Sequence, residues 1–187
     1  MNGTFTIESQ LIENCIKGDR ASQKALYETY SSKMFCICLK YSKNQLDAED
    51  ILQEGFVKLF NHLAKFRGEG SFEGWVRRIF VNTAIEHIRR KKLSTTLADG
   101  IENTIADTHY NALDDLYEKD LIKKSQTLSE GYRTVFSLYA IDGYSHKEIA
   151  SKLGITESTS KSQFSRAKAL LRNMLQNNSN NKLRIGI

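Results

Sequence analysis

The absence of proline from all 187 residues constrains the fold of this chain more than any other feature. Proline interrupts helix interiors because its ring fixes φ and because it has no backbone N–H to donate. With only 11 glycines as well, long helices can run unbroken, and apolar residues recur at intervals of three and four in most segments. We therefore expect an all-α fold, and 40% hydrophobic content can fill one large or two small cores.

Charge divides the chain into three parts. Residues 1–92 carry 15 cations and 11 anions, residues 93–118 carry no cation and 6 anions, and residues 119–187 carry 12 cations and 5 anions. The middle stretch is rich in Ser, Thr, Asn and Asp, a composition that indicates a linker. We expect two small helical domains, at residues 8–95 and 119–178, joined by an acidic linker at 96–118. That linker is either a solvated spacer or a segment that imitates nucleic acid in a positive channel of a partner.

The C-terminal domain has the pattern of a helix-turn-helix. Thr127 with Glu130, and Ser145 with Glu148, each have the S/T-x-x-E spacing of a capping box. Helices should therefore begin near residues 128 and 146.

A third helix should follow the second after a tight turn. Gly154 can end the second helix in a left-handed conformation, and Thr156 can cap the third. Ala150 is small enough for the helices to cross closely, with apolar contacts from Ile149, Leu153 and Ile155. The third helix presents polar and basic residues of the kinds that contact DNA in a major groove, although a basic amphipathic hairpin is the ordinary structural alternative.

The N-terminal domain contains an acidic helix and a basic helix. Residues 47–54 hold four acids and no cation, whereas residues 75–92 hold six cations against Glu86 alone. A phosphate backbone attracts the second segment and repels the first, so we expect one face for a protein and another for nucleic acid. The stripe of the acidic helix expected to pack inside is Ile51, Leu52, Val57, Leu59 and Leu63. The residues expected off that stripe are Asp50, Gln53, Glu54 and Phe56, where a merely solvated face is the alternative.

A glycine-rich loop separates the two helices. Residues 66–74, FRGEGSFEG, are too broken for a helix, and Ser71 can cap the helix that follows. Aromatic and polar groups on a short loop beside a basic helix can hold an unstacked base, and Asn82 is a candidate reader of a base edge. The alternative is that at least two of the aromatic residues Phe66, Phe72 and Trp75 are core anchors.

Taken in order, these motifs resemble a bacterial RNA polymerase sigma factor of the sigma-70 family, extracytoplasmic function group. The segments DAEDILQEGFVKLF, FRGEGSFEGWVRRIFVNTA and DGYSHKEIASKLGITESTSKSQFSRAKALL carry the likeness, which spans about residues 8–175. The resemblance implies a transcription initiation factor that binds core RNA polymerase, recognises a −35 duplex and melts a −10 element of promoter DNA. It also implies control by an anti-sigma factor.

The resemblance also implies roles for individual residues. The implied contacts with core polymerase are Asp50, Gln53, Glu54, Phe56 and Phe60. Those with the −10 element are Phe66, Arg67, Ser71, Phe72, Trp75, Arg77, Arg78, Asn82, Arg89 and Arg90. Those with the −35 element are Ser158, Thr159, Lys161, Ser162, Gln163, Ser165, Arg166 and Lys168.

Two positions of the third helix depart from the family's pattern. Ser160 stands where the helix-turn-helix usually has an apolar residue, and Gln163 stands where many relatives have a cation. We expect altered packing of the recognition helix from the first change and an altered base preference from the second.

Other kinds of site are not expected. The cysteines Cys15, Cys36 and Cys38 lack the spacing of a zinc site or an even disulfide set, which favours buried free thiols. We expect no metal, no cofactor and no catalysis, because carboxylate triads, a positioned nucleophile and a phosphate-binding glycine loop are missing. No long apolar stretch or signal peptide is recognised, so a cytoplasmic protein is expected. The tail, residues 177–187, should be disordered.

The sequence leaves two other classes of protein open. A stand-alone repressor or activator would bind duplex operators through its helix-turn-helix and use its first domain to dimerise. A recombinase or nuclease would need a clustered nucleophile or metal-binding carboxylates, and the acids at 47–54 lack partners for that. Specific duplex binding without polymerase would distinguish the stand-alone regulator from the sigma factor.

Overall fold

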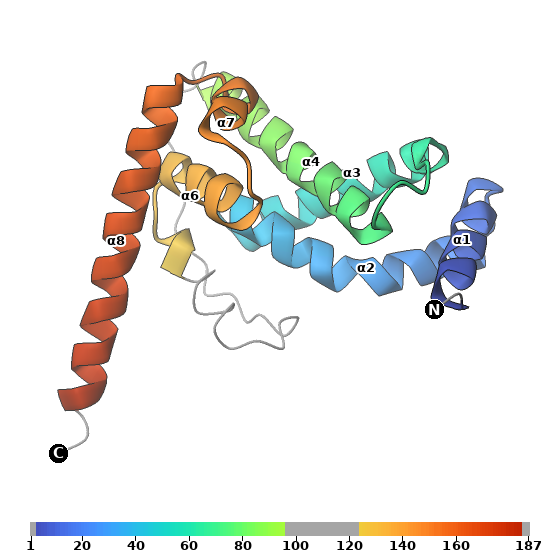
Figure 1. The fold of residues 1–187 in the computed structure, drawn as a ribbon, viewed down its shortest axis with the longest axis horizontal. Coiled ribbons are helices and arrows are strands. Elements are labelled where there is room, and N and C mark those ends of the chain that lie inside the picture. The colour runs from blue at the N-terminus through green and yellow to red at the C-terminus, as the bar shows by residue number, and fades with distance from the viewer. Residues whose placement is uncertain (1–2, 96–123, 185–187) are drawn as a thin grey trace.

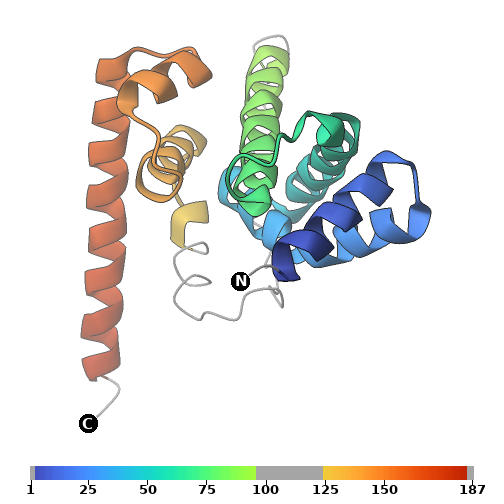
Figure 2. The same ribbon diagram turned by 45° about the vertical axis from the view of Figure 1, so that its right-hand side comes forward.

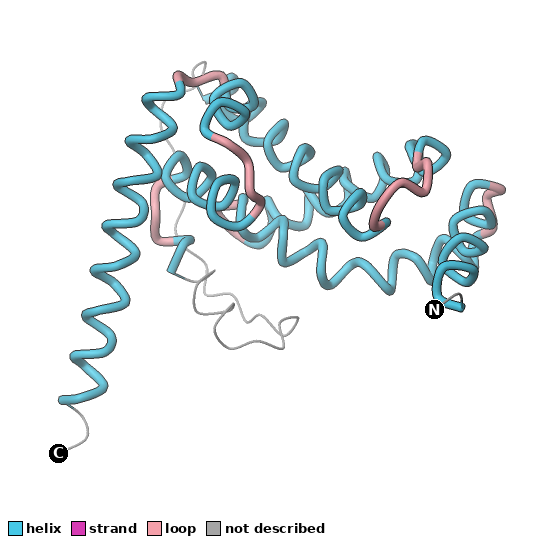
Figure 3. Tube along the Cα trace, in the orientation of Figure 1, coloured by secondary structure: helices cyan, strands magenta, loops and turns pink. Residues whose placement is uncertain are grey.

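The computed structural model describes residues 3–95 and 124–184, and these residues form helices joined by short turns, with no strand in either range (Figure 3). The all-α prediction is confirmed. The N-terminal part consists of α1 (Gly3–Ile16), α2 (Arg20–Tyr41), α3 (Gln45–His62), the short 3₁₀ helix η1 (Leu63–Lys65) and α4 (Phe72–Thr95). Helices α2, α3 and α4 all contact one another, and α1 packs on α2 (Figure 1).

The C-terminal part is built along one long helix. Its elements are α6 (Glu130–Phe136), a π-helical turn η2 (Ser137–Ile141), α7 (His146–Leu153) and α8 (Glu157–Arg184). Helix α8 contacts α6 and α7, and its end extends beyond the other helices (Figure 2). The acidic linker expected at 96–118 lies outside the described residues.

Side-chain caps determine where several helices begin. Asp19 accepts a 2.8 Å hydrogen bond from the Ser22 amide at the start of α2. Ser71 accepts a 3.3 Å bond from the Gly74 amide, as expected for the start of α4. Each bond satisfies an N–H that has no partner within its own helix.

The turn of the helix-turn-helix matches its sequence pattern. Ser145 and Glu148 form the reciprocal capping box that starts α7. Gly154 ends that helix with φ +64°, a left-handed conformation that favours glycine. Thr156 then accepts a 3.0 Å bond from the Thr159 amide and caps α8.

Two predictions at helix ends are wrong. Helix α6 begins at Glu130 rather than near residue 128, because Thr127 donates its hydroxyl hydrogen bond back to the Lys124 carbonyl at 2.7 Å and does not cap α6. The expected disorder of residues 177–187 is also incorrect for part of the tail, since α8 continues to Arg184.

The inward face of α3 differs from the expected stripe. Val57 is 60% exposed, whereas Phe56 is 4% exposed and packs against Phe80 of α4 at 5.1 Å between ring centroids. Gly55 is the physical reason, because its missing side chain leaves room for the Phe80 ring against the α3 backbone. Val57 lies two residues further on, rotated about 200° from Gly55, and therefore points outward.

The described core is continuous between the two parts of the chain. Val135, Leu138 and Ile149 belong to the same apolar cluster as the residues of α2, α3 and α4. A second, smaller cluster consists of Leu128, Ala167 and Leu171. Tyr132 and Phe136 of α6 pack against it, so it joins α6 to α8. The three cysteines are buried free thiols, as expected.

We predict that Gly55→Ala destabilises the protein by about 1–3 kcal/mol. A Cβ at this position would lie 2.4 Å from the buried Phe80 ring, so the ring or the helix must move. Gly74→Ala is the matched control, because there the nearest atom would be 3.8 Å away. The measurement is chemical denaturation of both variants, and equal stability of Gly55→Ala and the unchanged protein would contradict the close packing.

Candidate polymerase and nucleic-acid interfaces

The outer face of α3 combines apolar and polar side chains. Leu46 is 73% exposed and Val57 is 60% exposed, and Asp50 and Gln53 are exposed between them. Successive positions in this set are four, three and four residues apart, which places all of them on one side of the helix. We call Leu46, Asp50, Gln53 and Val57 the outer α3 face.

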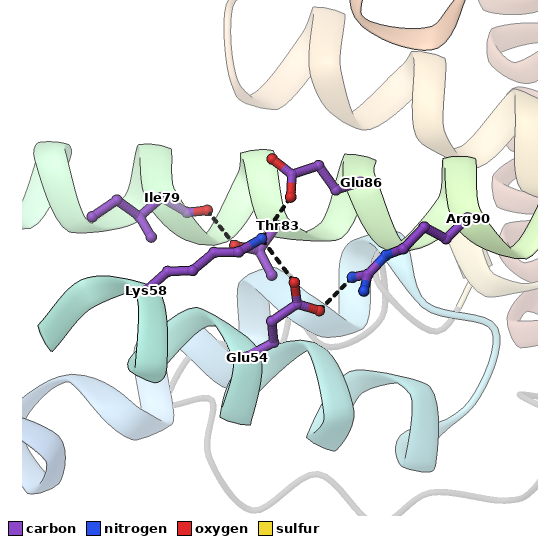
Figure 4. Close-up of polar contacts among 6 residues, drawn as sticks. All are labelled: Glu54, Lys58, Ile79, Thr83, Glu86 and Arg90. Carbon is purple, nitrogen blue, oxygen red and sulfur yellow. Dashed lines mark hydrogen bonds and ion pairs between the residues drawn. The ribbon is translucent and has the colours of Figure 1, made fainter. Parts of the chain in front are cut away.

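Glu54 lies apart from that face and binds cations of its own domain. Its carboxylate pairs with Lys58 at 2.8 Å and with Arg90 of α4 (Figure 4). Lys58 also reaches Glu86 of α4 at 2.6 Å. Desolvation of Glu54 opposes ionisation, but the hydrogen bonds from Lys58 and Arg90 outweigh it and lower the pKa of Glu54. This group, which we call the α3–α4 clasp, joins the two helices.

The clasp changes the expected separation of charge. Arg90 was expected to face nucleic acid and Glu54 a protein, yet they bind each other. Asp47 likewise pairs with Lys91 at 2.8 Å. Beneath the clasp, the buried Thr83 donates its hydroxyl hydrogen bond to the Ile79 carbonyl at 2.9 Å (Figure 4). Part of the opposite charge on the two helices therefore holds the domain together.

The two phenylalanines expected at the polymerase contact lie further inside. Phe56 is buried between Tyr27 and Phe80, with 4.5 Å between the ring centroids of Phe56 and Tyr27. Phe60 is half-buried and packs against the core. A side chain as buried as Phe56 offers little surface to a partner. The expectation that Phe56 lies on the exposed contact face is therefore wrong.

The aromatic residues of the loop pack on one another. Phe66, Phe72 and Trp75 have ring centroids 5.1 to 5.8 Å apart. Phe72 is 2% exposed and also meets Tyr30 edge-on, so it is a core anchor, whereas Phe66 and Trp75 are partly buried. The exposed residues of this loop include Arg67 and Ser71.

Helix α4 carries the expected cations and Asn82. Arg78 and Arg89 are exposed, whereas Arg77 and Asn82 are partly covered by the C-terminal part. Arg77 donates from Nε to Asp142 Oδ1 at 3.0 Å, and Lys152 donates to Asn82 Oδ1 at 2.8 Å. Asp142 and Lys152 were not among the residues expected at the site. No local pattern marks them, because their contacts span 65 and 70 residues of chain.

The recognition helix α8 presents most of its predicted residues to solvent. The exposed ones are Ser158, Lys161, Ser162, Ser165, Arg166 and Lys168. Thr159 and Gln163 are half-buried, and the Gln163 side chain lies against α6, where a Cβ on Gly131 would approach it to 3.2 Å.

Ser160 is buried and its polar group is satisfied. The side chain is fully buried, and its hydroxyl lies 2.9 Å from Nδ1 of His146 in α7. That imidazole stacks on Tyr139 at 4.2 Å between ring centroids. The serine therefore exchanges the apolar contact usual at this position for a hydrogen bond between the two helices of the motif.

Among the helices of residues 3–95 and 124–184, none has the length and apolar character needed to span a bilayer.

Known proteins match both parts of the chain. Residues 26–93 match Sigma-70 region 2, and residues 119–171 match Sigma-70, region 4. The ECF RNA polymerase sigma-E factor of Haemophilus influenzae is 29% identical over 182 residues, covering 90% of this chain and 95% of that protein. The ECF RNA polymerase sigma factor SigW of Bacillus subtilis is also 29% identical, covering 88% of this chain and 95% of that protein.

A solved structure has a similar fold. The sigma factor RpoE of Bartonella quintana, crystallised with the anti-sigma factor NepR, superposes with a TM-score of 0.53 at 24% identity, covering 82% of this chain and 96% of that one. With regions 2 and 4 both matched in order, this chain belongs to the sigma-70 family, in its extracytoplasmic function group.

Proposed function

We propose that this chain directs core RNA polymerase to specific promoters, recognising a −35 element as duplex and melting a −10 element. The observation that carries the proposal is the presence of sigma regions 2 and 4 in one chain, in the order that transcription initiation factors have. We assign residues 8–95 to polymerase and the −10 element, 96–118 to the linker, and 119–178 to the −35 element.

The outer α3 face is our candidate for docking on the polymerase. Leu46 and Val57 supply exposed apolar surface, and Asp50 with Gln53 supplies a charge and an amide between them. Protein interfaces typically combine apolar contact with hydrogen bonds from polar groups. Asp50 and Gln53 keep the role expected from the sequence, and Leu46 and Val57 are added to it.

Helix α4 and its preceding loop are our candidates for the −10 element. Arg77, Arg78 and Arg89 can hold phosphates, and Asn82 can bond to the edge of an unstacked base. The exposed Arg67 and Ser71 lie on the loop before this helix. Unstacking a base costs a few kcal/mol, which contacts with the captured base would offset, and no covalent bond changes in this process.

Helix α8 is our candidate for the −35 element. Its exposed hydroxyl and cationic side chains are the kinds that reach base edges and phosphates when a recognition helix lies in a major groove. Its N-terminal turns, from Glu157 onward, come directly after the turn of the helix-turn-helix, and the first turns of such a helix usually meet the bases.

Regulation by an anti-sigma factor is part of the proposal. The solved structure with a similar fold holds a sigma factor bound to an anti-sigma factor. We extend that class of partner to this chain.

Transcription in vitro tests the main proposal. The purified chain is added to sigma-free core polymerase with genomic fragments, and transcripts with defined start sites are expected. A stand-alone regulator would instead bind duplex DNA tightly and specifically without polymerase and would yield no transcript. That result would replace the sigma assignment.

We predict that Asp50→Lys weakens association with core polymerase by at least about tenfold, equivalent to 1.4 kcal/mol. The exposed carboxylate lies at the centre of the outer α3 face, and reversing a charge there opposes a basic partner. Co-purification with core polymerase measures the effect. Glu13→Lys on the exposed surface of α1 is the matched charge reversal and should bind normally. Glu54 is unsuitable for this test because its reversal would break the α3–α4 clasp.

We predict that Asn82→Ala destabilises the open promoter complex by about 1–3 kcal/mol while core polymerase still binds. The amide is our candidate for holding the flipped base, and α4 keeps its packing without it. Permanganate reactivity of unpaired thymines in the holoenzyme complex measures opening. Phe72→Ala is not an equivalent probe, because the 2% exposed ring supports the core. Equal loss of opening and of polymerase binding would indicate a packing role for Asn82.

A further inference from the structure

Helix α1 lies at the end of the molecule that carries the loop preceding α4. Residues 66–71 form this loop, since η1 ends at Lys65 and α4 begins at Phe72. Helix α1 contacts η1, and both lie at the same end of the molecule as the loop (Figure 1). Helix α1 also lies before residues 26–93, the segment that matches Sigma-70 region 2, so the match itself assigns it no role.

The first end of the loop is held through η1. The Phe66 amide donates to the Leu63 carbonyl at 3.1 Å, so the backbone enters the loop directly from this short helix. Leu63 is 1% exposed and belongs to the same core cluster as Ile12 and Cys15 of α1. A displacement of α1 would therefore disturb the segment from which the loop starts.

The second end of the loop is held through Tyr30 of α2. The Tyr30 ring is buried and meets Phe72, the first residue of α4, edge-on at 5.6 Å between ring centroids. Phe72 in turn contacts the rings of Phe66 and Trp75. Tyr30 is thus the fourth ring of the aromatic cluster, and it comes from outside the loop and α4.

A hydrogen bond between α1 and α2 fixes the Tyr30 ring. The Tyr30 hydroxyl donates to Glu8 Oε1 at 3.1 Å. Burial, followed by the charge of Glu8 and this hydrogen bond, raises the pKa of Tyr30 to about 12, so the hydroxyl keeps its proton and donates. A tyrosine side chain has only two rotatable torsions, so a fixed hydroxyl also fixes the ring. Glu8 therefore determines the surface that Phe72 meets.

An ion pair joins α2 to the start of α4 as well. Lys33 binds Glu73 at 2.8 Å, and both side chains are exposed. Exposed pairs of this kind contribute little stability. The buried contact between Tyr30 and Phe72 is therefore the one that we expect to align α2 with the start of α4.

The loop between these two ends has little packing of its own. Residues 67–71 are all exposed. Gly68 and Gly70 have φ of +73° and +85°, and a Cβ on either would meet no atom within 4 Å. Glycine gives the backbone wide conformational freedom. The conformation of the loop therefore depends on how its ends are held.

We propose that Tyr30 and Glu8 are positioning residues for the −10 surface: through their hydrogen bond, α1 holds the aromatic cluster from which the loop is presented to an unstacked base. The proposal rests on the function proposed above. Neither residue touches DNA. Without the bond the loop samples more conformations, and ordering it again around a base costs conformational entropy.

Trp75 allows the position of the cluster to be followed without DNA. It is the only tryptophan of the chain and packs against Phe66 and Phe72. Its fluorescence is excited at the red edge of its absorption, where tyrosine does not absorb, and acrylamide quenching measures its accessibility. Tyr30→Phe removes only the hydroxyl, and it should raise the quenching constant and shift the emission to longer wavelength. Tyr27→Phe, at a 45% exposed ring of the same helix, is the matched control and should change neither.

Variants of Glu8 test the other partner of the bond. Glu8→Ala removes the acceptor and should change Trp75 quenching as Tyr30→Phe does. Glu8→Gln keeps an acceptor oxygen and should restore most of the quenching behaviour of the unchanged protein. Glu8→Ala combined with Tyr30→Phe should add nothing further, because both remove the same bond. Glu13→Ala removes an exposed carboxylate from the same helix and serves as the control.

The functional test uses the holoenzyme formed with core polymerase. Tyr30→Phe and Glu8→Ala should each lower the amount of open promoter complex by about three- to tenfold, the range that one lost hydrogen bond allows. Permanganate reactivity of unpaired thymines measures this amount. Co-purification with core polymerase should be unchanged, because the outer α3 face keeps its residues. Thermal unfolding of each variant checks that the fold survives.

The outcomes separate this proposal from the proposed function. If Trp75 quenching is unchanged in Tyr30→Phe and Glu8→Ala, the bond does not hold the cluster and the proposal is wrong. Increased quenching with normal promoter opening also overturns it, as does an equal loss of opening and of polymerase binding. If the unchanged protein supports no transcription, the proposed function fails, and Trp75 quenching still decides whether α1 holds the loop.

Discussion

The packing of α4 against α3 is the contact on which the rest of the structure depends. Gly55 lets the Phe80 ring reach the α3 backbone, and Phe56 packs against that ring edge-on. The α3–α4 clasp joins the same two helices at their surface through Glu54, Lys58 and Arg90. Because the helices are fixed in this register, Val57 and Asp50 face outward from α3 while Arg77 and Asn82 lie along α4. One core thus positions both proposed interfaces.

Local features of this fold could be predicted from the sequence, because local chemistry determines them. Ser145, Gly154 and Thr156 start or end helices through bonds to residues at most four positions away. The inward face of α3 was harder to predict, since a stripe including Val57 and one including Phe56 both fit helical spacing. Choosing between them required knowing that a ring from α4 lies against Gly55, a contact that no periodicity within α3 contains.

The ion pairs between α3 and α4 could not be predicted from the sequence for the same reason. Counting charge along α3 and α4 suggested one acidic and one basic surface, yet Glu54 and Arg90 are 36 residues apart and bind each other. Exposed ion pairs of this kind contribute little stability individually, so the clasp mainly selects how the helices align. The net charge of a segment therefore overestimates the charge that a partner can contact. Exposed side chains such as Asp50 and Arg78 indicate the interfaces better than the total charge does.

The same reasoning applies between the two parts of the chain. The apolar cluster that includes Val135 and Ile149 brings the helix-turn-helix against α2 and α4, and such burial is not directional. Direction comes from Asp142, whose carboxylate accepts from Arg77 on one side and Tyr41 on the other. Removing either donor would leave a nearly buried charge with fewer partners, so both donors are needed for this arrangement of the two parts.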